Sequence, residues 1–346
     1  MAGQEVTFKI NRSQLLRDLC IRTTFTTTTT ALSNAQYPGL NMFEWIQLKS
    51  NNKVLMTITD AALRARVSDS PEAVKNWVYR AALPLVDATE LVQATSTAAS
   101  ACYTPIFSSF FEDVKSNLDL SFYEQLSITC KFNTPAKAGF AATTTTVTNA
   151  KLWVWTYLPD QKYLDVLRAR NQQPSKPLSM LSWNSFTERQ TCTSTTSNTI
   201  RMNVNYPVFK TYISVHPIVA TVNAPARVNS FSVDLGGVTL LSSVPNLVGT
   251  HESSMHGASY IRTTSASAVG FDDNKPICID WSLLPQDCFK QCGGAVSFSN
   301  INYPQVTVNH ATLGSAADYE VQVVHFFHQI YTLSSSDGSI LVSVKQ

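Results

Sequence analysis

The stretch that decides the fold is PICIDWSLLPQDCFKQCGGAVSFSN, which runs from Pro276 to Asn300. Large apolar side chains occupy every second position of the segment 277–281, a spacing typical of a half-buried β-strand. Pro285 then ends the hydrogen-bond ladder, because proline has no N–H to donate. Cysteines and glycines follow over 288–294, and a second apolar run begins at Val296. The stretch predicts a rigid corner of a β-sandwich and contains no recognisable catalytic grouping.

A second informative stretch lies mid-chain. NAKLWVWTYL occupies residues 149–158 and predicts a long strand, and the following segment, Pro159 to Arg170, has helical periodicity. A third long apolar run, Tyr319 to Thr332, predicts another long strand near the carboxyl end. The two halves of the chain therefore look like one architecture used twice, each half ending in a long strand.

These features, in this order, resemble the double jelly-roll major capsid proteins of large DNA viruses. In that family a strand ending in FxL, a PxxxxPSG turn and an NFS strand follow one another, and the first jelly roll ends in NxKLWVxYxxL before a linking helix. The positions in this chain that correspond to these motifs are Lys151, Leu152, Trp153, Val154, Trp281, Leu283, Pro285, Gly293, Phe298 and Asn300. The match is partial, because Gln291-Cys292-Gly293-Gly294 replaces the proline-serine-glycine corner and the linking helix lacks the family's acidic and arginine residues.

The resemblance implies an all-β fold of two consecutive eight-stranded antiparallel jelly rolls joined by a short helix. The expected boundaries are 1–158 for the first jelly roll, 159–177 for the helix and linker, and 178–346 for the second. It further implies a homotrimer that forms a pseudo-hexagonal capsomer and tiles an icosahedral shell in the virion. Minor capsid or penton proteins, and an internal membrane at the shell base, are the other implied partners. Such a protein is assembled inside the host cell and is not secreted.

The amino-acid composition is consistent with this interpretation as a self-associating capsid protein. Only 14% of the 346 residues are charged and 44% are hydrophobic, against roughly 25% charged in an average soluble domain. Much of the surface is then expected to be covered by other copies of the chain, the alternative being a secreted β-rich protein. The net charge of +2 gives no strong electrostatic case for binding nucleic acid or an anionic membrane. The segment 1–12 has no apolar core of a secretory signal, and no run is long enough to span a membrane.

Seven cysteines, an odd number, predict reduced and buried thiols. The count leaves open a disulfide within one pair.

Strand patterns dominate the chain. They predict strands at 42–48, 54–59, 77–83, 126–132, 145–158, 200–204, 208–215, 227–235, 238–241, 277–283, 296–301 and 319–332. Helical periodicity is convincing only at 13–20, 84–94 and 159–170. Gly236-Gly237 predicts a tight hairpin turn. The Ser/Thr run at 191–199 is either an exposed strand or loop, or disordered.

No residue is assigned to a catalytic, cofactor or metal site. His325 and His328 are three apart, so on one strand their side chains point to opposite faces and do not share a metal ion. Cys288 and Cys292 would need distant histidines to form a zinc site. Asp272-Asp273 lacks the spaced oxygen donors of a calcium loop. Trp153, Trp155 and Tyr157 share a strand face, which is expected to be buried between sheets or against the partner jelly roll; the alternative is a platform for stacking sugars or bases.

Two other functions remain open, a carbohydrate-active enzyme and a glycan-binding attachment protein, each built on two jelly-roll sandwiches. An enzyme would need carboxylates gathered between the sandwiches, drawn from acids such as Glu252, Asp280 and Asp287. The expected outward loops are 84–119 and 241–274, and the segments 1–13 and after 335 are expected near the shell base.

Overall fold

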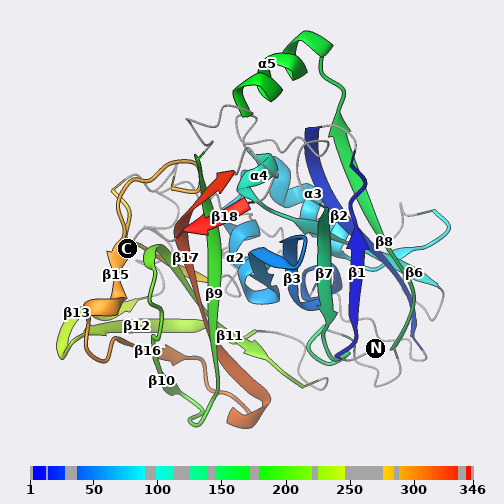
Figure 1. The fold of residues 1–346 in the computed structure, drawn as a ribbon. Coiled ribbons are helices and arrows are strands. Elements are labelled where there is room, and N and C mark those ends of the chain that lie inside the picture. The colour runs from blue at the N-terminus through cyan, green and yellow to red at the C-terminus, as the bar shows by residue number, and fades with distance from the viewer. Residues whose placement is uncertain are drawn as a thin grey trace.

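The computed structural model describes residues 3–12, 15–27, 37–89, 99–112, 125–138, 140, 145–171, 179–219, 225–245, 276–283, 288–333 and 340–343. These residues form four antiparallel sheets, two in each half of the chain, with short helices between and around them (Figure 1). The all-β expectation is therefore confirmed.

The described residues of the first half form eight strands in two four-stranded sheets. One has the order β1-β7-β3-β4 and the other β5-β6-β2-β8. Their bounds are β1 Glu5–Lys9, β2 Leu15–Thr27, β3 Phe43–Ser50, β4 Lys53–Thr59, β5 Leu85–Val86, β6 Ser100–Ile106, β7 Leu126–Phe132 and β8 Thr145–Tyr157. The helices are α1 Pro38–Asn41, α2 Asp60–Ser68, α3 Glu72–Ala82, α4 Ser109–Glu112 and, beyond β8, α5 Gln161–Asn171.

The second half repeats the two-sheet plan. A four-stranded sheet has the order β10-β16-β12-β13, and a six-stranded sheet is built on β14-β11-β17-β18, with β15 added to β11 and β9 added to β17. The bounds are β9 Ser179–Thr191, β10 Ser197–Arg201, β11 Pro207–Pro217, β12 Val228–Leu235, β13 Val238–Pro245, β14 Ile277–Asp280, β15 Val296–Ser297, β16 Gln305–His310, β17 Tyr319–Leu333 and β18 Ile340–Ser343. The predicted hairpin at Gly236-Gly237 is confirmed, and both glycines have positive φ.

The hydrophobic core of the first half extends into the second half. A cluster that fills the first sandwich continues into the second half through Trp183, Phe326 and Tyr331. A separate cluster lies between the two sheets of the second half and includes Phe231, Val306 and Val323 among its members. The boundary between the halves is therefore packed like an interior.

Strand β9 joins the halves directly. Its Asn184 side chain accepts a hydrogen bond from the Thr57 N–H of β4 at 3.1 Å, and Ser185 Oγ donates to the Thr57 carbonyl at 2.8 Å. Thr59 Oγ1 and Thr187 Oγ1 lie 2.7 Å apart. The six-stranded sheet of the second half is thus hydrogen-bonded through side chains to the edge of the first.

Two expected elements have the opposite secondary structure. The segment 13–20 was expected to be helical, but its described residues begin β2. A β-bulge between Leu16 and Asp18 inserts a residue, so Leu16 and Leu19 are both fully buried although they are three apart. The segment 77–83 was expected as a strand, but α3 runs to Ala82. Buried Val78 and Ala82 are four apart, which places them on one face of that helix.

Three further expectations need correction. The described part of the expected helix 84–94 forms the short strand β5, because Leu85 pairs with Ala101 of β6. The expected strand 277–283 ends at Asp280, and that at 296–301 ends at Ser297 and continues as a 3₁₀ turn. For the Ser/Thr run at 191–199, the strand-or-loop alternative is confirmed: Thr191 ends β9, Ser197 begins β10, and in the turn between them the N–H groups of Thr193 and Ser194 both donate to Asn198 Oδ1.

Candidate functional sites

The corner at 276–300 brings several of the family-like positions together. The Leu283 N–H donates to the Gly293 carbonyl at 2.8 Å. The rings of Trp281 and Phe298 meet edge to face, with centroids 5.7 Å apart. Trp281 Nε1 also donates to Thr211 Oγ1 of β11 at 2.9 Å. These contacts fasten the corner to the six-stranded sheet, so its role in the structure is to hold the fold together.

Other positions of this motif have different surroundings. Pro285 lies outside the described residues. Asn300 is exposed at the end of the 3₁₀ turn, and the Leu283 side chain is 87% exposed. Gly294 has a φ of +112° beside the Leu283 side chain, so this corner requires glycine at that position.

The second group of family-like positions, Lys151 to Val154, lies on β8. Leu152 is half-buried and faces the interior of the sandwich, whereas Lys151 and Trp153 are exposed. Trp153 and Trp155 are 48% and 40% exposed, and their rings are stacked with centroids 6.4 Å apart. Tyr157 continues this row, and the Arg17 guanidinium lies 5.3 Å from its ring centroid.

The expectation that Trp153, Trp155 and Tyr157 are buried between sheets is therefore wrong. β8 is the last strand of its sheet, and the helices α1 and α3 pack against β6 on the far side of β2. The aromatic side chains on the outer face of β8 are only partly covered. The aromatic residue types suggested burial, but side chains on a sheet face stay exposed wherever no other element packs on that face.

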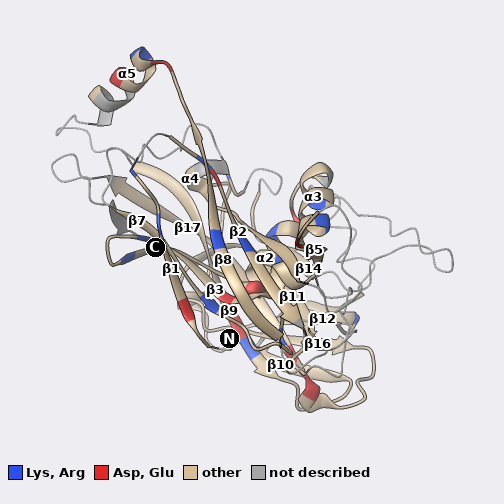
Figure 2. Cartoon of the chain, turned by 90° about the vertical axis from the view of Figure 1, so that its right-hand side faces the viewer, with Lys and Arg blue, Asp and Glu red and all other residues tan. Residues whose placement is uncertain are grey.

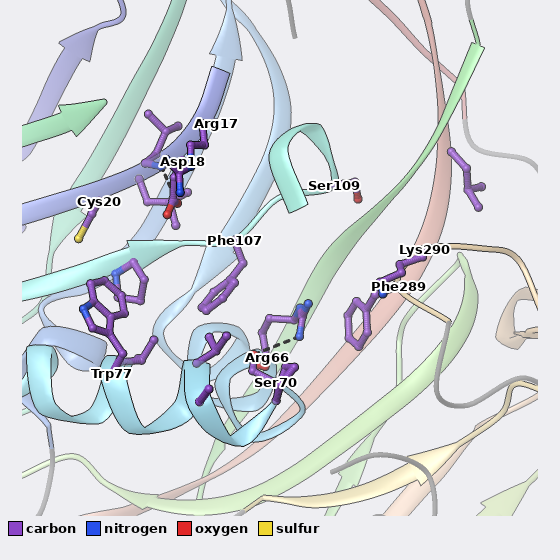
Figure 3. Close-up of a pocket in the computed structure, with 18 residues that line it drawn as sticks. Arg17, Asp18, Cys20, Arg66, Ser70, Trp77, Phe107, Ser109, Phe289 and Lys290 are labelled. Atoms are coloured by element: carbon purple, nitrogen blue, oxygen red, sulfur yellow. Dashed lines mark hydrogen bonds between the residues drawn. The ribbon is translucent and has the colours of Figure 1, made fainter. Parts of the chain in front are cut away.

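A pocket of about 600 Å³ lies beside this face, between α3, β2 and the corner of the second half. Trp77 stands at one end, Phe289 and Lys290 stand at the other, and Arg66 lies between them (Figure 3). The Arg66 guanidinium lies 4.3 Å from the Phe289 ring centroid, a cation–π contact. The lining is mostly apolar with three cationic side chains, the third being Arg17. Asp18 adds one carboxylate, so the lining holds three cationic side chains and one anionic side chain.

The pocket offers no activated nucleophile. Ser70 Oγ donates to the Arg66 carbonyl at 2.9 Å, and Ser109 Oγ accepts from the Trp183 N–H at 3.1 Å. Burial, followed by the charge of Asp18, raises the pKa of the Cys20 thiol. A raised pKa keeps the thiol protonated and unreactive. The pocket is therefore a binding cavity in chemical terms, without the groups of a hydrolytic site.

The carboxylates between the two halves are held in ion pairs. Arg189 of β9 binds both Asp60 of α2 and Glu320 of β17, and Lys137 lies 3.3 Å from Glu320. Burial would raise the pKa of Asp60, but Arg189 and Arg64 hold it below its ordinary value. A carboxylate that stays ionised between arginines cannot serve as a general acid. This cluster links the halves.

A buried array in the second half has the residue types of a catalytic triad. Thr211 Oγ1 lies 3.0 Å from His325 Nδ1, and His325 Nε2 lies 3.5 Å from Glu188 Oε2. Thr211 and His325 are fully buried, and Trp281 Nε1 donates to the same hydroxyl. Because no substrate can reach this hydroxyl, we interpret the array as a structural network.

The two histidines of the H-x-x-H sequence lie in different environments. His325 contacts the Phe298 ring, whereas His328 stacks on Phe209 and its Nε2 lies 2.7 Å from the Cys288 carbonyl. The expectation that they face opposite sides of one strand is confirmed.

Among the described residues, no group of three or more His, Cys, Asp or Glu side chains is placed to hold a metal ion. His251, Glu252, His256, Asp272, Asp273 and Asp287 lie outside the described residues. The same part of the chain contains no helix with the length and apolar character of a membrane span.

All seven cysteines are free thiols, and Cys292 is the exposed one. Burial raises the pKa of Cys192 to about 11 and that of Cys288 to about 12. The six buried free thiols agree with the expectation of buried, reduced thiols, whereas the exposed Cys292 departs from it.

No protein-family model and no curated protein matches the chain. Solved structures do match it. PBCV-1 VP54, fitted into a reconstruction of the virophage Sputnik, is 13% identical with a TM-score of 0.72, covering 100% of this chain and 94% of that one. The Faustovirus major capsid protein is 10% identical with a TM-score of 0.63, covering 95% and 87%. The mavirus major capsid protein is 11% identical with a TM-score of 0.57, covering 99% and 87%. The chain therefore has the double jelly-roll fold of these viral major capsid proteins.

Proposed function

We propose that this chain is a structural major capsid protein and not an enzyme. The observation that carries the proposal is the structural likeness to viral major capsid proteins, which extends over the whole of this chain and most of the length of theirs. Because identities of 10–13% establish a fold and leave function open, the assembly described next is part of the proposal.

In the proposed assembly, three copies associate so that six sandwiches form a pseudo-hexagonal capsomer, and capsomers tile an icosahedral shell. The shared core and the Arg189 ion pairs support this, because two halves joined so firmly would act as one rigid building block. The sparse charge on the strands (Figure 2) favours contacts that depend on shape.

The further partners and the location follow from the same proposal. The protein would reside in the virion shell and assemble inside the host cell. The segment 84–119, expected as an outward loop, instead contains the strands β5 and β6 and the helix α4, and the other expected outward loop, 241–274, begins within β13. Segments 1–13 and after 335 would face the base, toward minor capsid or penton proteins and an internal membrane.

A second candidate function rests on the exposed aromatic row of β8. Stacked, solvent-facing Trp153 and Trp155, with Tyr157 beside them, form a surface on which a sugar ring could stack. A glycan-binding attachment protein would use this surface as a soluble molecule and would not form arrays.

The test is analytical ultracentrifugation of the purified chain at micromolar concentration, followed by negative-stain imaging of the fastest species. We expect compact trimers with a hexagonal outline, alone or in sheets and shells. A monomer at every concentration would contradict the capsid proposal, and glycan-array binding by that monomer would support the second candidate.

A further inference from the structure

The pocket between α3, β2 and the corner of the second half has the dimensions of a ligand site. Its volume is about 600 Å³. Close packing leaves few voids larger than a water molecule within a folded protein, whereas small-molecule sites have volumes of about 300–1,000 Å³ and often lie between two domains. Both the volume and the position at the junction of the halves are those of a binding site.

The wall of the pocket is formed mainly by apolar side chains from both halves of the chain. Val74 and Trp77 of α3 line it and are 37% and 52% exposed. Ile106 ends β6, Phe107 follows it, and Phe289 comes from the second half. Apolar side chains that remain in contact with water inside a concave site gain free energy when an apolar ligand covers them. The wall therefore favours a ligand with an apolar chain.

The charged side chains of the lining differ between its two sides (Figure 3). Arg66 and Lys290 lie toward the second half, whereas Arg17 and Asp18 are neighbours on β2 and lie on the opposite side. Asp18 Oδ1 accepts a hydrogen bond from the Leu19 N–H at 2.8 Å. One cation and one anion thus offset each other on the β2 side, and the other side has two cations.

Arg66 is held in place on that cationic side. Its guanidinium lies 4.3 Å from the Phe289 ring centroid, and its Nη1 donates to Ser70 Oγ at 3.3 Å. A guanidinium is always charged, and its planar shape and weak hydration suit it to carboxylates. An anionic head group would be attracted to this side of the pocket.

The buried charges behind Phe289 reduce this attraction without cancelling it. Lys210 Nζ lies 5.5 Å from the Phe289 ring centroid, 2.9 Å from Asp69 and 3.7 Å from Asp280. One cation and two carboxylates leave one negative charge there, against the two positive charges of Arg66 and Lys290 in the lining. The second-half side of the pocket keeps an excess of positive charge.

We propose that this pocket binds a single-chain amphiphile of the fatty-acid class. Its alkyl chain would lie against α3 and the end of β6, and its carboxylate would lie toward Arg66 and Lys290. The inference goes beyond the capsid proposal and does not depend on it, because the whole lining belongs to one chain. A ligand that contacts both halves would stabilise the folded protein as its concentration rises.

The experiment is isothermal titration calorimetry of the full-length protein with two probes, each below its micelle-forming concentration. Dodecanoate is the anionic probe, and dodecyltrimethylammonium has the same alkyl chain with a cationic head. Melting temperatures with and without dodecanoate give a second readout, and circular dichroism checks that each variant folds.

Two pairs of variants separate the pocket from the rest of the surface. Ala73→Phe places a large side chain in the lining, and Asn76→Phe places the same side chain at an exposed position of α3 that does not line the pocket. Lys290→Glu reverses a charge of the lining, and Lys53→Glu makes the same change at the exposed start of β4.

We expect the natural chain to bind one dodecanoate with a Kd between about 10 μM and 1 mM, and the cationic probe at least about tenfold more weakly. Ala73→Phe should weaken dodecanoate binding at least about tenfold, because it fills the space of the alkyl chain. Lys290→Glu should weaken it about 3- to 10-fold. Asn76→Phe and Lys53→Glu should bind like the natural chain, and dodecanoate should raise the melting temperature of all proteins that bind it.

Three results would overturn the inference. A natural chain that does not bind dodecanoate, or an Ala73→Phe variant that binds it unchanged, would rule out the site. Equal affinity for the two probes would rule out the anionic head group. Equal weakening in a variant and its control would show that dodecanoate binds elsewhere on the surface.

Discussion

At the scale of single residues, the buried charges of this protein are paired across element boundaries. Lys210 of β11 is 1% exposed, and its Nζ lies 2.9 Å from Asp69, which follows α2. Burial alone would lower the pKa of this lysine, but Asp69, Cys278, Cys288 and Asp280 together outweigh burial and raise it. Buried charges are tolerated when they are paired in this way. Each pair fixes the first half against the second.

His216 gives a pH prediction at this scale. Burial and then Arg64 lower its pKa to about 3, although Asp60 acts in the opposite direction. The folded protein therefore holds a neutral His216, whereas the unfolded chain binds a proton below about pH 6.5. Stability is full above pH 6.5 and falls as the pH drops toward 3, by about 1.4 kcal/mol per pH unit. Between pH 7 and 5 the natural chain should lose about 2 kcal/mol more than His216→Asn.

Urea unfolding at each pH measures this difference. Asparagine keeps a donor for the Pro217 carbonyl, which lies 3.1 Å from His216 Nδ1. His328, whose pKa burial also lowers, is present in both proteins and cancels from the comparison. Parallel pH profiles for the two proteins would show that His216 is accessible to protons in the folded state.

At the scale of elements, the corner after β14 depends on one aromatic contact. Phe298 is 3% exposed and meets the Trp281 ring edge to face. Phe298→Ala should cost about 3–5 kcal/mol of unfolding free energy, because it leaves a cavity in the core of the second half. Asn300→Ala, two positions on and exposed, should change stability by less than about 0.5 kcal/mol.

Urea denaturation of both variants checks this contrast between two positions of one motif. If Phe298→Ala cost less than about 1 kcal/mol, the corner would owe its rigidity to the Leu283–Gly293 hydrogen bond instead.

At the scale of the whole molecule, the shared core predicts cooperative unfolding. Tyr331 and Gln329 of β17 both donate to the Leu55 carbonyl of β4, and Trp183 of β9 lies in the core of the first half. Separating the halves would expose these groups to water. We therefore expect one calorimetric transition, with equal calorimetric and van't Hoff enthalpies.

The variant Arg189→Met tests the same prediction. It removes the guanidinium that pairs with buried Asp60 and Glu320. It should lower stability by about 3–5 kcal/mol while unfolding remains a single transition. Two resolved transitions in the natural chain would mean that the halves are independent domains, divided near the expected linker 159–177.

The predictability of the fold varies with the kind of residue that forms each element. Long strands such as β17 could be predicted, because a strand that is buried on both faces has a nearly continuous run of apolar residues. β9 could not, because its sequence SMLSWNSFTERQT carries polar side chains that bond across to β4 or take part in ion pairs. β2 was misleading because its bulge gives a strand the apolar spacing of a helix.

By itself the sequence determined the fold class, the repeated two-sandwich plan and the order of the family-like motifs. These depend on local alternation, turn residues and composition, which are properties of neighbouring positions. The tertiary structure alone decided which aromatic residues are buried, where the charges pair, and which strand ends each sheet. Those properties depend on contacts between residues far apart in the chain, such as Arg189 with Asp60. The exposure of Trp153 and Trp155 is the clearest case, because it depends on which elements pack on that face of β8.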